Sequence, residues 1–458
     1  MAKYFEQFNT KNIKPVMQRI KMKSALEYWS SDTLPVAKYT WVYGPKKPRD
    51  QIREQEIPDE KVDIQTLVEK GLITLLDTVE ISTITDVEKL SNDADAYIVG
   101  DMEDWLTDEE LLEAIARKGK PLIAEWDHWG YSIHGRLSKF RLNRFRNVKH
   151  IVSMGSNDIY TLIKALRAIR YLKTLRILYI GEYPPRSVAV PNGLTLKDVE
   201  KKFGLKILKT SFDEYVNTVE NIPLDEAKKV SSQWLRAYNV ADHLKSNLAE
   251  YAKIYLGIKK LLEKYEANAL TVECPALPRI KYVPCLAFSL LLDEGIPAGC
   301  EADLPALLTM SILMAASNDA ALMGNLNENV THWDIEHNIV TINHDVVPPS
   351  YACSNCRYYV KDYHNMKIGT TSYTELEPGL RVTIAGMHWN MDKLWATRGE
   401  VASTHDTVHC RITIRVRVDN AKRVSRYAFG HHVVLIRGDY TEILRTIAEF
   451  LNLEFYEF

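Results

Sequence analysis

The stretch Cys300–Glu301–Ala302–Asp303–Leu304, continued by the residues up to Met310, carries two carboxylates where the pattern of the chain changes. It follows an apolar-leaning run over 282–292 and a break over 293–297, and the apolar residues after it recur at helical spacing. Glu301 and Asp303 therefore lie where a strand or loop turns into a helix. Carboxylates there are favoured by the helix N-terminus and can hold a metal, move a proton or only cap the helix. Capping explains Asp303 well and Glu301 less well, because Asp but not Glu is a preferred N-cap.

On both sides of this junction the chain falls into three blocks. In two of them, up to about residue 318, short apolar runs alternate with helical stretches, which is typical of parallel sheets covered by helices. In the last block, short β-type runs separated by turn residues predict a mainly antiparallel, barrel-like domain. We therefore predict an α/β protein with domains over 1–172, 173–318 and 319–458, the last one β-rich.

The expected elements are assigned from apolar periodicity. Residues before Pro35 are expected to form a leading helix or arm. Strands are expected at 36–43, 72–78, 96–99, 121–126, 150–154, 175–181, 205–208, 269–274, 333–335, 338–343, 380–387, 397–401, 409–418 and 432–436. Helices are expected at 109–117, 160–170, along an apolar stripe over 244–262, after Glu301 and at 441–451.

Composition limits the classes of function. A chain of 458 residues with 46% hydrophobic residues can bury a large core, and a net charge of −2 argues against nucleic-acid or membrane-surface partners. We see neither an apolar run of about 18 residues that could span a membrane nor the apolar segment of a signal peptide. Six cysteines make no disulfide framework, so a cytoplasmic setting is expected, with Cys353 and Cys356 as ordinary loop thiols.

Histidines near strand ends suggest a metal site. His431 and His432 precede an apolar strand, and His344 follows another. Because neighbouring residues of a strand face opposite sides, at most one of His431 and His432 should reach a given metal. A lone histidine is more often structural, but Glu301 and Asp303 together with two strand-end histidines suggest a site with mixed nitrogen and oxygen ligands. Such ligands suit Mn²⁺, Fe²⁺, Co²⁺ or Zn²⁺.

An aromatic cluster over 125–131 follows a predicted strand of the first block. It contains Trp126, Asp127 and Trp129. Aromatic faces beside polar groups can grip a sugar ring, whereas aromatic packing at a domain interface explains the cluster equally well. The sequence contains neither a P-loop nor a G-x-G-x-x-G motif, so nucleotide binding has no positive support.

Several segments in the C-terminal part resemble the L-fucose isomerase-like family of sugar isomerases. They run in order over about 190 residues with plausible spacing, and the N-terminal block matches only in its α/β character. The segments are Ala269–Leu–Thr–Val–Glu–Cys274, 284–287, 293–296, 300–310, Met323–Gly–Asn325, the His344 segment, 398–401 and Gly430–His–His–Val–Val–Leu–Ile–Arg–Gly–Asp439.

The resemblance implies two Rossmann-like α/β domains followed by a barrel-type domain, with a divalent metal, usually Mn²⁺, between the second and third. It implies a homo-oligomer, a trimer or hexamer, in which one subunit's first domain helps close another's site. By position, Glu301 and His432 match metal ligands of the family, and His344 lies near a histidine ligand of the related L-arabinose isomerases. The cluster with Trp126, Asp127 and Trp129 corresponds to a sugar-contacting region.

One position departs from the family pattern. Asn325 stands where well-known fucose isomerases have an aspartate that serves as metal ligand and base. An amide can ligate weakly through its oxygen, but it cannot take up a proton near neutral pH. We expect His344 to supply the missing ligand, and Asp303 or Asp345 the second base.

The predicted activity is aldose–ketose isomerisation of a free sugar. A carboxylate moves a proton between C1 and C2 through an enediol. Glu301 is expected to bind the metal and act as one base. The alternatives are a different metal-dependent carbohydrate enzyme, an epimerase or lyase, which Asn325 favours, and a non-catalytic sugar-binding homologue.

Overall fold

The structure, a computed structural model, describes residues 13–22, 64–100, 109–125, 148–151, 156–188 and 193–458. Its contacts divide the chain into two compact units, Lys14–Arg167 with Glu449–Asn452, and Ala168–Ala448 with Leu453–Phe458. The division into three domains at 172 and 318 stays a prediction. The mixed α/β class, with parallel sheets followed by an antiparallel barrel, is confirmed.

The first unit is built on a five-stranded parallel sheet in the order β2-β1-β3-β4-β5. Its strand β1, between β2 and β3, lies where we expected a leading helix or arm, and that expectation is wrong because Met17 and Ile20 are buried in the sheet core. The strand expected at 36–43 lies outside the described residues. The elements are β1 (Val16–Met22), α3 (Ile64–Glu69), β2 (Thr74–Ile81), η5 (Ile84–Lys89), β3 (Ala96–Gly100), α4 (Glu109–Ala116), β4 (Leu122–Glu125), β5 (Val148–Ile151) and α6 (Ser156–Thr174).

The second unit begins with a four-stranded parallel sheet in the order β10-β9-β6-β7. Its β9 is buried along its whole length, as a strand covered on both faces should be. The apolar stripe over 244–262 belongs to two helices, α10 and α11, rather than one. The elements are β6 (Arg176–Ile180), α7 (Leu196–Phe203), β7 (Lys206–Thr210), α8 (Phe212–Glu220), α9 (Leu224–Ala237), β8 (Asn239–Val240), α10 (Asp242–Lys245), α11 (Leu248–Lys264), β9 (Ala269–Val272), α12 (Cys285–Asp293), β10 (Ala298–Cys300) and α13 (Leu304–Ser317).

A closed antiparallel barrel of six strands follows, in the order β15-β18-β11-β12-β17-β16, with β15 paired to β16. The segment 333–335 was expected to be β-type, but it lies in a short helix whose start Thr331 and Asp334 cap. The elements are β11 (Leu322–Leu326), α14 (His332–Glu336), β12 (Ile339–His344), β13 (Tyr359–Lys361), η10 (Tyr363–Asn365), β14 (Thr371–Tyr373), β15 (Arg381–Met387), β16 (Lys393–Asp406), β17 (Ile412–Val418), α15 (Ala421–Tyr427), β18 (His432–Arg437), α16 (Thr441–Phe450) and β19 (Glu454–Glu457).

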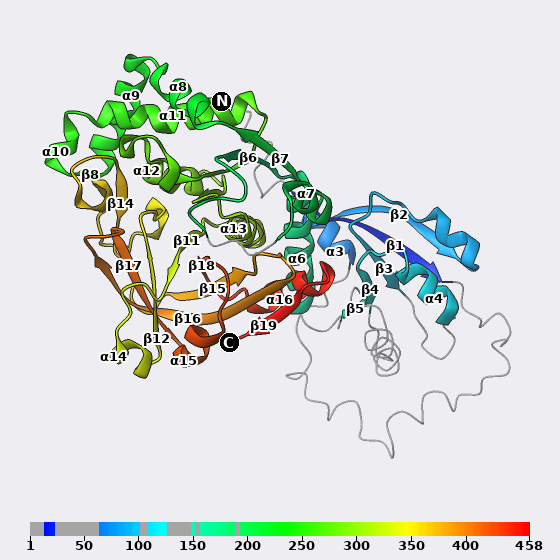
Figure 1. The fold of residues 1–458 in the computed structure, drawn as a ribbon. Helices are drawn as coiled ribbons and strands as arrows, with labels where there is room; N and C mark the ends of the chain where they lie inside the picture. The colour runs from blue at the N-terminus through cyan, green and yellow to red at the C-terminus, as the bar shows by residue number, and fades with distance from the viewer. Residues whose placement is uncertain (1–12, 23–63, 101–108, 126–147, 152–155, 189–192) are drawn as a thin grey trace, which may run out of the picture. The chain divides into compact units, whose positions relative to one another are not determined.

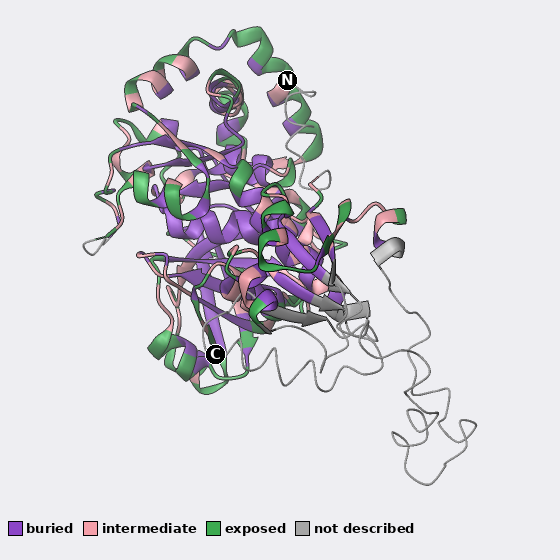
Figure 2. Ribbon diagram, turned by 90° about the vertical axis from the view of Figure 1, so that its right-hand side faces the viewer, coloured by how far each residue is buried: buried purple, intermediate pink, exposed green. Residues whose placement is uncertain are grey.

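Helix α13 connects the parallel sheet of the second unit to the barrel. It contacts β10 of the sheet. It also contacts β15 and β18 of the barrel, which lie beside it in Figure 1. Its residues from Leu304 to Ala316 are all buried, as expected for a helix that is apolar on every face (Figure 2). The start of α13, which carries Glu301 and Asp303, is thereby held at the junction of sheet and barrel.

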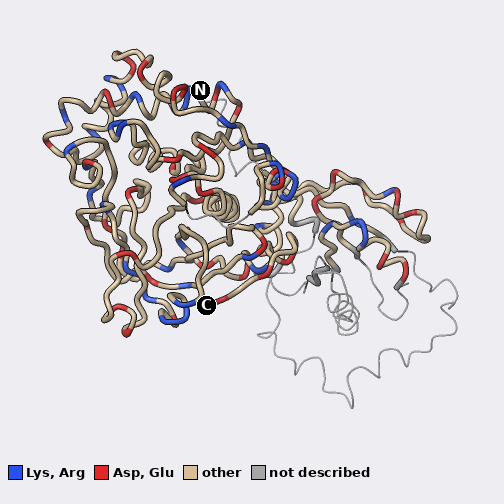
Figure 3. The backbone as a smooth tube through the Cα atoms, viewed as in Figure 1, with Lys and Arg blue, Asp and Glu red and all other residues tan. Residues whose placement is uncertain are grey.

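The distribution of charge and the hydropathy of the helices bear on the sequence predictions. Acidic and basic residues are interspersed along the described backbone (Figure 3), in keeping with the net charge of −2. No helix among the described residues is long and apolar enough to cross a membrane.

Cys353 and Cys356, expected to be ordinary thiols, are joined by a disulfide in the structure, so that expectation is wrong.

Candidate active site

The turn between β10 and α13 gives Glu301 and Asp303 different surroundings. Glu301 and Ala302 both have left-handed backbones, with φ of 58° and 56°, which are uncommon for residues other than glycine. Asp303 is the N-cap of α13, and its Oδ1 accepts a hydrogen bond from the Ala306 nitrogen at 3.0 Å. This turn leaves Glu301 partly exposed, with 24% of its side chain accessible, while Asp303 is buried. Strained turns of this kind are concentrated at functional sites.

His432 is held between these two carboxylates. The Nδ1 atom of His432 lies 3.0 Å from Asp303 Oδ2, which also accepts the His432 backbone N–H at 3.2 Å. Its Nε2 lies 3.7 Å from Glu301 Oε1, and this buried nitrogen has no hydrogen-bond partner among the described residues. The arrangement fixes the ring through Nδ1 and aims Nε2 toward Glu301. A carboxylate behind one imidazole nitrogen and an unpaired nitrogen in front is the usual setting of a metal-binding histidine.

His431 reaches Glu301 as well. Its Nε2 lies 3.4 Å from Glu301 Oε2, and its ring centre lies 4.5 Å from that of His432. We expected the two histidines to face opposite sides, but β18 begins only at His432, so the alternation of a strand does not govern His431. Both carboxylate oxygens of Glu301 therefore face a histidine.

The charges of these groups are coupled. Burial opposes ionisation of Glu301, yet hydrogen bonds with His431 and the positive charge of His432 hold the pKa of Glu301 well below its usual range. Burial also opposes protonation of His432, but its hydrogen bond with Asp303 and the neighbouring Glu301 raise the pKa of His432 to about 9. Two carboxylates thus surround one buried imidazole. A divalent cation at Nε2 can replace the proton there.

His344, at the end of β12, completes the inner cluster. Its ring centre lies 5.3 Å from that of His432, and burial followed by the charge of His432 lowers the pKa of His344 to about 4. The Asp345 backbone N–H donates to Nδ1 of His344 at 2.8 Å, so the ring of this neutral histidine carries its proton on Nε2. In this orientation His344 can donate a hydrogen bond to a sugar oxygen. Metal binding through Nε2 requires the ring to turn.

Both carboxylate oxygens of Asp345 make hydrogen bonds outside the Glu301–His432 cluster. Its Oδ2 lies 2.7 Å from His364 Nε2, and its Oδ1 accepts the Arg411 backbone N–H at 3.0 Å. Burial opposes ionisation of Asp345, but the hydrogen bond with His364 and its charge lower the pKa of Asp345. His364 was missed from the sequence because it lies in the short η10 turn with a left-handed φ of 47°, where no periodic pattern singles it out.

Asn325 lies on β11, beside the cluster. In the strand register it is directly opposite His432 on β18 and Asn343 on β12. The neighbouring Gly324 leaves space for this packing, since a Cβ there would lie 2.7 Å from Ile342 Cγ2 and 3.3 Å from His344 Cβ. Asn325, which replaces the aspartate of the family pattern, therefore borders the Glu301–His432 cluster.

Glu273 is a second residue that sequence reasoning missed. It is fully buried just after β9, and its carboxylate accepts the backbone N–H groups of Glu182 at 2.9 Å and Arg186 at 2.6 Å. It thereby fixes the loop after β6. The next residue of that loop, Ser187, donates to the Glu301 carbonyl at 3.3 Å, so Glu273 supports the turn that carries Glu301.

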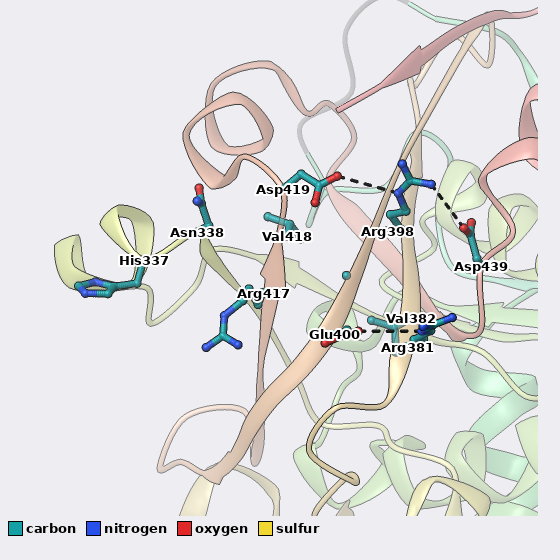
Figure 4. A pocket seen from close by; sticks show the side chains of 11 residues that line it. His337, Asn338, Arg381, Val382, Arg398, Glu400, Arg417, Val418, Asp419 and Asp439 are labelled. Carbon is teal, nitrogen blue, oxygen red and sulfur yellow. Dashed lines mark ion pairs between the residues drawn. The ribbon is translucent and has the colours of Figure 1, made fainter.

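The predicted sugar contacts and a charged cavity in the barrel do not belong to this cluster. Trp126, Asp127 and Trp129 lie outside the described residues. A cavity of about 600 Å³ opens at the other end of the barrel, lined by charged residues such as Arg381, Arg398 and Asp439 (Figure 4). None of the predicted site residues lines this cavity. Its Asp439 follows the end of β18, whereas His432 begins that strand, so the two lie at opposite ends of the barrel. The chemistry-bearing cluster, rather than this cavity, is the candidate active site.

Comparison with known proteins gives two kinds of relative. Residues 179–318 match the family model of the L-arabinose isomerase central domain. Sulfoquinovose isomerase of Priestia aryabhattai is 25% identical over 409 residues, which cover 81% of this chain and 89% of that protein. L-arabinose isomerase of Mannheimia succiniciproducens is 26% identical over 176 residues, 36% of this chain and 35% of that protein. The first similarity extends over most of the chain, and the second is confined to part of it.

These relatives bear on the predictions made from the sequence. They support a sugar isomerase family in general rather than the L-fucose isomerase-like family in particular. The predicted enzyme class, an isomerase that interconverts aldoses and ketoses, is confirmed at that level by both kinds of relative.

Proposed function

We propose that this protein is a metal-dependent aldose–ketose isomerase whose reaction centre is the Glu301–His432 cluster. The observation that carries the proposal is the buried Nε2 of His432, which has no hydrogen-bond partner among the described residues, faces Glu301 at 3.7 Å and is backed by Asp303. A buried polar atom without a partner is costly, and a bound cation removes that cost.

The residues present fit a divalent metal. Glu301 and His432 are the proposed ligands, with His431 in reach of the same carboxylate and Asn325 beside them in the strand register. His344 is the proposed third ligand, through a second imidazole nitrogen. Turning its ring releases Nδ1 from the Asp345 N–H, so that Nδ1 takes the proton and Nε2 is free to bind. Oxygen and imidazole ligands with open positions suit Mn²⁺, our first candidate; such a metal polarises the substrate carbonyl.

Glu301 is the proposed base. Among the carboxylates of the cluster it is the partly exposed one, so it can approach a bound sugar, and its depressed pKa keeps it ionised. As a carboxylate it can take the proton from one sugar carbon and return it to the neighbouring carbon through an enediol.

Asp303 and Asp345 have different proposed roles. Asp303 accepts three N–H groups and is buried, so we assign it to holding His432 rather than to moving protons. Asp345 makes a single side-chain contact through Oδ2, with His364 at 2.7 Å, and does not cap a helix. Of the two aspartates considered as second base, Asp345 is therefore the one that the contacts favour.

The substrate is proposed from the relatives. Their names specify sulfoquinovose and L-arabinose, both aldoses, and the sequence resemblance adds L-fucose. Trp126, Asp127 and Trp129 remain proposed sugar contacts, and a homotrimer or homohexamer remains the proposed assembly.

The experiment joins metal analysis of the purified protein to a Mn²⁺-supplemented screen of these three sugars. We expect bound metal and ketose formation from at least one of them. Glu301→Gln should lose turnover by about a thousandfold or more and lose most of the metal. Glu400→Gln, at the other end of the barrel, should change neither. Full turnover by metal-loaded Glu301→Gln would refute the proposal.

A second candidate is a different metal-dependent carbohydrate reaction on this site, such as epimerisation. The amide at Asn325, in place of a carboxylate beside His432, is the observation that favours it. Bound metal and sugar binding without ketose formation would support this candidate.

A further inference from the structure

A second cluster of metal-binding residues lies outside the Glu301–His432 group. His364, His409 and Cys410 each place a ligand atom within 4.8 Å of the other two. His364 comes from the η10 turn, and the other two come from the loop between β16 and β17. The sequence brings these residues together only through the fold, because His364 and His409 are 45 positions apart.

The backbone holds two of the three in uncommon conformations. His364 has φ of 47° and Cys410 has φ of 46°, both left-handed. The Cys410 carbonyl accepts hydrogen bonds from Thr407 Oγ1 and, at 3.5 Å, from Asn343 Nδ2, so the loop is fastened to the end of β12. Strain that the surroundings maintain in two converging residues is a common mark of a functional site.

Each of the two histidines has one imidazole nitrogen close to a carboxylate oxygen. Asp345 Oδ2 lies 2.7 Å from His364 Nε2, and Glu328 Oε1 lies 3.3 Å from His409 Nδ1. A carboxylate on one nitrogen of a histidine is the usual outer-shell partner in metal sites, because it sets the tautomer and makes the ring more basic. His409 is thus arranged as a metal ligand is. In His364, Nε2 faces both Asp345 Oδ2 and Cys410 Sγ, which lies 3.7 Å away, so a metal at Nε2 takes the place of the contact with Asp345.

We propose that His364, His409 and Cys410 bind a zinc ion, with a water in the fourth position. Two imidazoles and one thiolate are a donor set that selects Zn²⁺, whereas the oxygen-containing Glu301 cluster suits Mn²⁺. Ligand atoms around tetrahedral zinc lie about 3.3–3.7 Å apart, so the cluster has to contract by about 1 Å. His409 can supply that movement, since 69% of its side chain is exposed.

Binding changes the protonation of Cys410. Burial and the charge of Asp345 raise the pKa of its thiol, so without metal the thiol is protonated. Zinc takes the thiolate, and the thiol proton leaves to solvent. An occupied site would also release Asp345, the residue that follows His344, from its contact with His364. The second metal would therefore act on one side of the proposed active site without touching the sugar.

Cobalt substitution tests the site through a signal that the Glu301 cluster cannot give. A Co²⁺–thiolate bond produces a charge-transfer band in the near ultraviolet, and no ligand of the Glu301 cluster is a thiolate. We expect this band on titration of the protein with Co²⁺, and its loss when Zn²⁺ is added. Cys410→Ser should abolish the band and one bound zinc, and His409→Gln, a change at an exposed side chain, should weaken zinc binding about tenfold or more.

Two controls separate this site from others. The double variant Cys353→Ser/Cys356→Ser removes the two cysteines of the disulfide and should keep the band. Glu301→Gln should keep the band while losing the metal of the proposed catalytic cluster, so the two proposals fail independently. Absence of the band in the unaltered protein, or its persistence in Cys410→Ser, would overturn the zinc site.

Discussion

Asp303 Oδ2 accepts two hydrogen bonds from His432, one from the ring Nδ1 at 3.0 Å and one from the backbone nitrogen at 3.2 Å. The other oxygen of Asp303 caps α13 at the Ala306 nitrogen. One buried carboxylate therefore joins the helix that follows Glu301 to the strand that begins with His432. The relative positions of the two proposed ligands depend on it.

Asp303→Asn tests this link. The amide oxygen can still cap α13, but an amide NH₂ would then face Nδ1 and force the ring proton onto Nε2, which removes the lone pair that a metal needs. We expect metal affinity to fall by about tenfold to a hundredfold, measured by calorimetric titration with Mn²⁺. The matched control is Asp334→Asn, an equally buried aspartate at the start of α14. Unchanged affinity in Asp303→Asn would show that Asp303 only caps the helix.

Gly324→Ala tests the packing behind His344. The new Cβ would lie 2.7 Å from Ile342 Cγ2 and 3.0 Å from the Asn343 carbonyl, so β12 has to move and His344 with it. We expect a loss of about 1–3 kcal/mol in stability and at least tenfold in kcat/KM.

Gly399→Ala is its control in the same barrel. A Cβ at Gly399 would lie 2.5 Å from the Arg417 carbonyl, at the end that carries the charged cavity. It should lower the melting temperature similarly and leave kcat/KM intact. An equal loss of kcat/KM in both variants would mean that Gly324 acts on global stability alone.

The alternation of apolar runs and helices was enough to predict the architecture. Parallel sheets and an antiparallel barrel follow from short apolar runs, which the chain shows clearly in strands such as β6, β12 and β18. β1 could not be predicted in this way, since Gln, Arg and Lys interrupt its sequence Val–Met–Gln–Arg–Ile–Lys–Met and only its neighbours in the sheet bury Met17 and Ile20.

The candidate site could be predicted only in part, because some of its residues lie at boundaries that the sequence marks and others do not. Glu301, His344 and His432 lie at ends of elements, where the sequence marks a boundary. His364 and Glu273 depend on contacts across 19 and 91 positions, with Asp345 and Glu182, and local patterns carry no information on such contacts. The direction of the His431 side chain was predicted wrongly because strand alternation applies only to residues within a strand, and β18 begins at His432. The exact ends of elements are the part that sequence patterns define least well.

Asn325→Asp tests the departure from the family pattern. Aspartate there would add a carboxylate opposite His432 in the register of β11 and β18. If the proposed isomerase uses Glu301 with a weak amide ligand, the change should raise Mn²⁺ affinity and increase ketose formation several-fold. Asn327→Asp, two residues later on the same segment, is the control and should change neither. A fall in turnover with tighter metal would instead show that the amide itself serves the reaction.

Glu214 provides a test of stability against pH away from the site. Its carboxylate accepts hydrogen bonds from Lys264 at 2.6 Å, Thr210 at 2.6 Å and Tyr265 at 2.7 Å, and these partners lower the pKa of Glu214 to about 2. Because the folded pKa is below the ordinary value of 4.5, the stabilisation is fully present above pH 4.5 and is lost as the pH falls toward 2. Glu214→Gln should therefore cost about 1 kcal/mol at pH 7, a value reduced for solvent screening of the exposed Lys264. Melting temperatures of the two proteins should differ at pH 7 and 5, differ less at pH 3, and converge as the pH approaches 2; a constant difference would mean that packing rather than charge causes the effect.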